Sequence, residues 1–243
     1  PAVGGFLIQS MLRLISRLDE GEVTPMTLAS IIEHSGMIKT YLLCSDDMDS
    51  EMDRLASDRQ FLDLVSSRAY HSDRFKSSIG GVGMLGSTTH VSVIDRDMNA
   101  VTVTTTNGAG CGYVVPEFGF MMNNMLGEDD LNPQGISSWE AGSRIPTMMA
   151  PTMLFKDGEF SCVLGSGGSS RIKSAIFQVL VNIIFKGMSL EDAVSAPRLH
   201  IENDTLYTEP GIDLSLDVSD VCRFSSPNLF FGGVNAVSLS AAV

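Results

Sequence analysis

Cross-linking and metal-ligating residues are scarce in this chain. Its 243 residues include four cysteines, which are far apart and form no CxxC pair, and four scattered histidines. Disulfide frameworks and zinc sites need such residues at close, recurring spacing. We therefore expect free or buried thiols, with neither a disulfide framework nor a metal site.

Basic residues and long apolar runs are also few. The chain has 16 Lys and Arg against 29 Asp and Glu, a net charge of -13. Nucleic-acid binding depends on clustered basic side chains, so this balance argues against such a partner. No stretch reaches the roughly 18 apolar residues of a membrane span. The most apolar run, residues 172–185, contains Lys173, Gln178 and Asn182 and indicates a buried helix.

The two ends of the sequence favour a piece of a longer protein. The chain begins with Pro1 and ends within a strand-like run, residues 234–243. We expect truncation at both ends. No signal peptide is recognisable, and the compartment stays open.

The first third of the chain has the apolar spacing of helices. Apolar residues recur at helical intervals over residues 6–18, and Thr24-Pro25 has the residue types that open a second helix. Residues 57–67 indicate a third helix. The glycine-rich residues 72–87 predict a loop that separates the two halves of the chain.

Strands and helices alternate after this loop. Residues 90–94 and 100–106 form one predicted hairpin, and a second surrounds Asp157-Gly158. A long helix is expected over residues 170–185 and a short one over 190–196. This order predicts a layered α+β fold in which helices cover sheets.

Thr88 stands where a self-cleaving enzyme would carry its nucleophile. A threonine hydroxyl needs a nearby base, and the α-amino group of an N-terminal threonine can supply one, with an ordinary pKa of about 7.7 to 8.0. Cleavage between Ser87 and Thr88 would create that N-terminus. The simpler alternative is a polar turn that leads into a strand.

Two further segments could contribute to such a site. Residues 165–171 form a glycine-rich turn between a strand and a helix, whose backbone N–H groups can face an oxyanion. The alternative is a plain tight turn, since the Gly-Lys-Ser/Thr of a phosphate loop is missing. Residues 123–131 contain three consecutive acids, which could hold a substrate ammonium or form an exposed acidic loop.

The order of these segments resembles the γ-glutamyltranspeptidase family of N-terminal-nucleophile hydrolases. The resemblance covers nearly the whole chain. It rests on five segments, namely residues 1–5, 88–90, 95–99 with 101–106, 165–172 and 196–200. It implies an αββα sandwich, with residues 1–87 as the end of a large subunit and 88–243 as most of a small subunit, both from one precursor.

The resemblance also implies roles for individual residues. Thr88 would be the nucleophile and Thr106 would tune it, while Gly168 and Ser169 would donate oxyanion-hole N–H groups. The remaining implied residues would bind substrate, with the α-amino group taken by one of the two acids, and they are Asn107, Glu128, Asp130, Thr147 and Met148.

The implied reaction needs no metal or organic cofactor. A γ-glutamyl group from glutathione or a related compound passes to Thr88, and water or an amine then accepts it. Thr147-Met148 replaces the family's paired serines, and Met125 replaces a polar residue, which makes the pocket less polar. This leaves three alternatives: an acylase for β-lactam side chains, a poly-γ-glutamate depolymerase, or a non-catalytic fragment.

Overall fold

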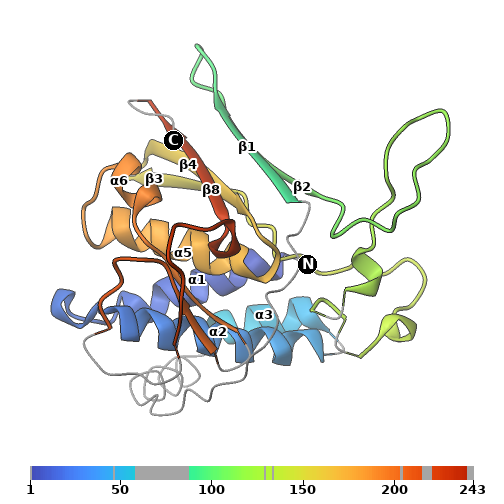
Figure 1. Ribbon diagram of the computed structural model, residues 1–243, viewed down its shortest axis with the longest axis horizontal. Helices are drawn as coiled ribbons and strands as arrows, with labels where there is room; N and C mark the ends of the chain where they lie inside the picture. The colour runs from blue at the N-terminus through green and yellow to red at the C-terminus, as the bar shows by residue number, and fades with distance from the viewer. Residues whose placement is uncertain are drawn as a thin grey trace.

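One layer of the protein is helical. The computed structural model describes residues 2–45, 47–57, 88–128, 130–132, 134–202, 205–214 and 221–239. The helices are α1 (Val3–Ile15), α2 (Pro25–Leu43), α3 (Met48–Ser57), α5 (Ile172–Ile184) and α6 (Leu190–Ser195). In Figure 1, α1 and α5 lie beneath the main sheet, and α2 lies below α1.

Two sheets lie on the helical layer, one above the other. Strands β3 (Thr152–Lys156), β4 (Glu159–Gly167) and β8 (Gly233–Ser238) form an antiparallel sheet in the order β3-β4-β8. Strands β1 (Thr88–Ile94) and β2 (Ala100–Thr106) form a hairpin that packs on β4 and β8 (Figure 1). A helical layer and two sheets thus follow one another, as in an αββα sandwich.

A third, smaller sheet lies beside the helices. Its strands are β5 (Leu199–Glu202), β6 (Thr205–Thr208) and β7 (Val221–Arg223), with β5 antiparallel and β7 parallel to β6. β5 packs on α2 and so connects this sheet with the helical layer.

The main hydrophobic core joins residues from distant parts of the chain. Met11 and Ile15 of α1 are fully buried, as are Ile176 and Phe177 of α5, and Leu164 of β4 belongs to the same cluster. The apolar run in α5 is therefore a buried helix, as its composition predicted. Burial of these side chains holds the first helices against the sheet.

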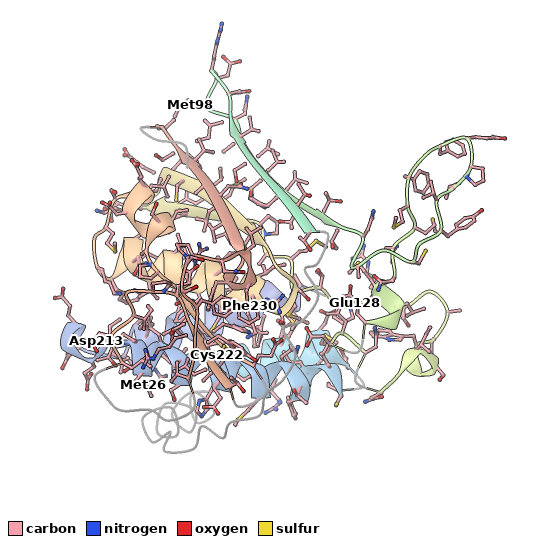
Figure 2. All side chains as sticks on the ribbon, viewed as in Figure 1. Met26, Met98, Glu128, Asp213, Cys222 and Phe230 are labelled. Carbon is pink, nitrogen blue, oxygen red and sulfur yellow. The ribbon has the colours of Figure 1, made fainter. Side chains whose placement is uncertain are left out.

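The hairpin, whose side chains are drawn as sticks in Figure 2, has one polar face and one apolar face. On the inner face, His90 Nδ1 lies 2.8 Å from Thr104 Oγ1 and its Nε2 lies 2.9 Å from Ser92 Oγ. On the outer face, four valines are 50–53% exposed, and they are Val91, Val93, Val101 and Val103. These polar side chains form a hydrogen-bonded network on the face that packs against the main sheet.

Local sequence features account for several element boundaries. Pro25 opens α2, so the predicted helix start is confirmed, and the Thr24 side chain caps it by accepting a hydrogen bond from the Thr27 N–H at 3.2 Å. Both predicted hairpins are present, and the second turns at Asp157-Gly158. The α+β fold class is likewise confirmed.

Other boundaries differ from the prediction. The long helix begins at Ile172 and not at residue 170, because Ser169–Arg171 form a 3-10 turn. Helix α3 was not predicted. The predicted helix over 57–67 and the loop over 72–87 lie, but for residue 57, outside the described residues.

No helix within the described ranges has both the length and the apolar character that crossing a bilayer requires.

The adjacent glycines of α1 offer a test of the packing between α1 and the segment before β3. A Cβ on Gly4 would collide with the Met148 carbonyl, whereas one on Gly5 would meet nothing within 4 Å. We expect Gly4→Ala to lower the free energy of unfolding by about 1–3 kcal/mol, as overpacking does. Gly5→Ala should leave it unchanged or raise it by up to about 1 kcal/mol through helix propensity. Urea denaturation measures both, and equal effects would contradict the close approach.

Candidate active site

Two threonine hydroxyls meet where the β1–β2 hairpin ends. Thr88 and Thr106 are paired in the antiparallel register, and their Oγ1 atoms lie 2.9 Å apart. The Gly108 N–H donates to Thr106 Oγ1 at 3.0 Å. This second bond fixes the Thr106 hydroxyl, which in turn fixes the direction of Thr88 Oγ1.

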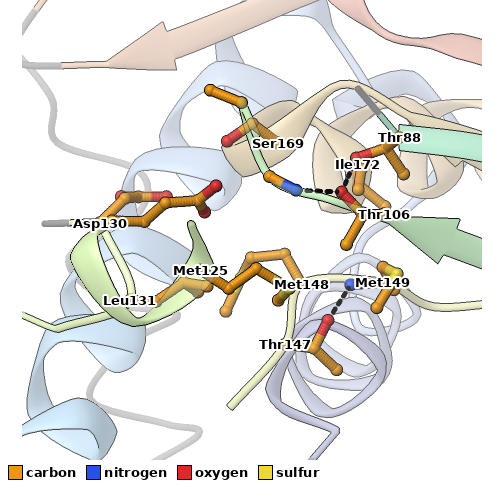
Figure 3. A pocket seen from close by; sticks show the side chains of 13 residues that line it. Thr88, Thr106, Met125, Asp130, Leu131, Thr147, Met148, Met149, Ser169 and Ile172 are labelled. Atoms are coloured by element: carbon orange, nitrogen blue, oxygen red, sulfur yellow. Dashed lines mark hydrogen bonds between the residues drawn. The ribbon is translucent and has the colours of Figure 1, made fainter. Parts of the chain in front are cut away.

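These hydroxyls open onto a pocket of about 190 Å³. Figure 3 shows Thr88 and Thr106 at one end, Asp130 and Leu131 at the other, and methionines between them. The lining residues are Thr88, Thr106, Gly108, Ala109, Met125, Glu128, Asp130, Leu131, Thr147, Met148, Met149, Ser169 and Ile172. The pocket is thus polar at its two ends and apolar in its middle.

The turn after β4 contributes Ser169 to the wall of the pocket. Gly168 has φ 127° and Ser169 has φ 54°, and the Ser169 residue lines the cavity. Neither backbone N–H donates a hydrogen bond to a described residue, while the Arg171 N–H donates to the Gly168 carbonyl at 3.1 Å. The positive φ angles turn the chain so that the N–H groups of residues 168 and 169 stay unbonded.

The acidic end of the pocket holds two carboxylates with different surroundings. Asp130 forms an ion pair with Lys39 of α2, ninety-one positions away in the chain. Glu128 has no ion pair or hydrogen bond to its carboxylate among the described residues, and burial, with a smaller contribution from Asp130, raises its pKa. Glu128 is therefore the carboxylate that is free to bind a cation.

Asparagine side chains hold the loop that carries these acids. Asn132 Nδ2 donates to the carbonyls of Met125, Leu126 and Glu128 at 2.9–3.0 Å. Asn124 Oδ1 accepts from the Ala109 N–H at 2.8 Å and ties the loop to the end of β2. The motif pointed to the acids, but it did not reveal these supporting contacts.

The structure gathers most of the predicted site residues into one pocket. Thr147 and Met148 both line it, and Thr147 Oγ1 accepts from the Met149 N–H at 3.1 Å. Asn107 is exposed and does not line the pocket, whereas the next residue, Gly108, does. Ser87 lies outside the described residues.

His90 and His200 take part in other contacts. His90 bonds to Thr104 and Ser92, and burial lowers its pKa. His200 Nδ1 lies 2.8 Å from Ser174 Oγ, and burial, followed by three nearby cations, lowers its pKa well below the ordinary value. Neither ring is hydrogen-bonded to Thr88, so neither of these two histidines acts on the threonine as the histidine of a serine-protease triad does.

A family model described as gamma-glutamyltranspeptidase matches residues 40–226. The chain belongs to this family. The glutathione hydrolase proenzyme of Bacillus subtilis (strain 168) is 37% identical over 160 residues, which cover 63% of this chain and 27% of that protein. The Acylase ACY 1 proenzyme of Pseudomonas sp. (strain SE83) is 35% identical over 164 residues, 65% of this chain and 29% of that protein. The chain therefore spans less than a third of the length of these relatives.

One solved structure has a similar fold over nearly the whole chain. The crystal structure of cephalosporin acylase from Bacillus halodurans aligns with 98% of this chain and 46% of its own, with a TM-score of 0.73 and 18% identity. At this identity the likeness concerns the fold alone. The family inferred from the sequence motifs is confirmed.

The positive φ angle of Ser169 leads to a stability prediction. A left-handed conformation costs a non-glycine residue roughly 1–2 kcal/mol. We expect Ser169→Gly to raise the free energy of unfolding by about 0.5 kcal/mol, part of the gain being offset by the flexible unfolded state. Ser169→Val should lower it by about 1–2 kcal/mol. Chemical denaturation of both variants tests this, and an unaffected valine variant would contradict the turn geometry.

Proposed function

We propose that this chain carries the nucleophile and most of the acyl pocket of a γ-glutamyl-transferring enzyme. The donor is glutathione or another γ-glutamyl compound, and the acceptor is water or an amine. The observation that carries this proposal is the arrangement of one pocket, with the Thr88–Thr106 hydroxyl pair at one end and Glu128 and Asp130 at the other.

Thr88 acts as both nucleophile and base in this proposal. Cleavage between Ser87 and Thr88 frees the threonine amine, which takes the proton of Oγ1 as this oxygen attacks the γ-carbonyl. The unbonded N–H groups of Gly168 and Ser169 donate to the oxyanion that forms. The amine leaving group receives the proton, and water or a second amine then attacks the Thr88 ester and releases the acyl group.

Glu128 is the proposed partner of the donor's α-ammonium group. Both acids line the pocket, but the Asp130 carboxylate is already paired with Lys39. Lys39 holds Asp130 in place, and the negative charge of Asp130 adds to the potential that a cation meets at Glu128. The middle of the pocket accommodates the methylene groups of the glutamyl chain against Met125 and Met148.

An acylase for glutaryl-type side chains is the second candidate. Met125 and Met148 give the pocket an apolar middle, and one relative at 35% identity is named an acylase. A glutaryl group has the same chain as a γ-glutamyl group but lacks the α-ammonium. The two candidates therefore differ in whether the acidic end of the pocket contributes to substrate binding.

The cut before Thr88 divides the chain into two proposed subunits. Residues 1–87 are the end of the large subunit and residues 88–243 belong to the small subunit. Both derive from one precursor, and α1 and α2 of the first part pack against α5 and β5 of the second. The buried core shared by the two parts supports an assembly that stays together after the cut.

The neighbouring threonines 88 and 89 provide a matched pair for testing the nucleophile. We expect Thr88→Ala to abolish cleavage before residue 88 and to lower kcat for γ-glutamyl anilide hydrolysis at least about a thousand-fold. Thr89 is exposed on the opposite face of β1, so Thr89→Ala should retain both activities. Intact-mass spectrometry and the anilide assay measure the outcomes, and a Thr88→Ala variant that is still cut there would contradict the mechanism.

The raised pKa of Glu128 leads to a pH-dependent prediction. The group protonates at a higher pH than an ordinary glutamate, so the affinity for an ammonium is present above that pKa and is lost as the pH falls through it. We expect KM for a γ-glutamyl anilide to rise on the acid side, while KM for a glutaryl anilide stays constant. Glu128→Gln should raise the first KM by about ten-fold or more and leave the second unchanged.

Asp130→Asn is the control for this assignment. Because Asp130 is paired with Lys39, its loss should affect the γ-glutamyl substrate less than the loss of Glu128. A larger effect of Asp130→Asn would transfer the role to Asp130. A preference for the glutaryl anilide in the unmodified protein would favour the acylase, and failure to process or turn over either substrate would favour a non-catalytic fragment.

A further inference from the structure

A second cavity, of about 370 Å³, lies on the other side of the Lys39–Asp130 pair. It is bounded by α2, by the first residues of α5 and by β5. Asp130 lines both cavities, while Ser169 faces the first and Ser170 the second. The proposed reaction does not use this second cavity.

Lys173 is the unusual residue in its wall. The side chain is 4% exposed, yet its ammonium forms no hydrogen bond or ion pair with any residue that the structure describes. His200 also lines the cavity, is 2% exposed, and has no partner for Nε2 within the same described ranges. Buried polar groups are normally satisfied, so an unpartnered His200 Nε2 beside an ammonium without an ion pair indicates that a ligand completes the contacts of this cavity.

The other charges around the cavity are largely matched within the protein. Lys39 pairs with Asp130. Arg171 lies 3.5 Å from Glu202, which also accepts a hydrogen bond from Ser170 Oγ at 2.8 Å. Lys173 forms no such ion pair with a described residue, and Asp130 and Glu202 act on its charge only at longer range.

We propose that this second cavity binds a small monocarboxylate, with the Lys173 ammonium as its counter-ion and His200 and Ser170 beside it. The inference rests on the contacts of the cavity and is independent of the proposed γ-glutamyl transfer.

The charge of the walls selects a monoanion. Glu33, Asp130 and Glu202 line the cavity beside Lys39 and Lys173, so three carboxylates face two ammonium groups and repel a dianion such as phosphate more strongly than a monoanion. A carboxylate carries one charge and has two oxygens that can accept from the Lys173 ammonium. Burial, and to a smaller extent Lys39, lowers the pKa of Lys173 to about 8, so the lysine is mainly charged at neutral pH and can respond to a bound anion.

Lysine NMR tests the proposal, because the chain has only five lysines, at positions 39, 76, 156, 173 and 186. In protein labelled with 13C-lysine, we expect sodium acetate to shift the Lys173 Cε–Hε signal saturably and to raise the pKa of Lys173 by about one unit. The exposed Lys156 should not respond. Acetamide, which has the shape of acetate without its charge, should have no effect.

Substitutions of lysines show whether the acetate-induced shift arises from binding in the second cavity. Lys39 also lines the cavity, so its signal should shift with acetate as well. In Lys173→Met this Lys39 response should disappear, whereas Lys156→Met should preserve it. Lys173→Arg keeps the charge, should also preserve the Lys39 response, and remains informative if the methionine variant does not fold. The proposal is overturned if Lys173 responds no more than Lys156, or if phosphate binds more tightly than acetate.

Discussion

The close approach of the β1–β2 hairpin to strand β4 is the constraint on which the candidate site depends. Gly165 and Gly167 lie on the same face of β4, since side chains alternate along a strand. A Cβ on Gly165 would collide with the His90 ring, and one on Gly167 with the Thr88 carbonyl. Without side chains at these two positions, the hairpin can lie against the sheet and bring Thr88 to the turn that follows β4.

The polar inner face of the hairpin is the consequence of that approach. The two sheets meet through hydroxyl and imidazole groups, and Asn235 of β8 donates to the His90 carbonyl at 3.1 Å. Hydrogen bonds have directional geometry, so they fix the register of the hairpin more narrowly than apolar contacts would. The rigidity of Thr88 thus comes from a network that extends well beyond the pocket.

Local features were predictable from the sequence, and distant contacts were not. The helix start at Thr24-Pro25 and the turn at Asp157-Gly158 depend on neighbouring residues, and both were predicted correctly. Helix α3 is rich in acidic residues, and its apolar face consists of only Met48, Met52 and Leu55 at helical spacing, a short pattern that the prediction missed. The Lys39–Asp130 pair joins two segments whose proximity is set only by tertiary packing. Motif matching identified Asp130 as a candidate residue, but only the folded structure revealed that Lys39 is its ion-pair partner.

The core shared by α1, α2 and α5 has a consequence for any molecule cut before Thr88. The intact chain folds in a unimolecular reaction, whereas the cut protein consists of two polypeptides held by burial alone. Its unfolding becomes a dissociation, so its midpoint depends on protein concentration. Dilution then opposes reassembly, and the persistence of the mature molecule is governed by how slowly its two polypeptides separate.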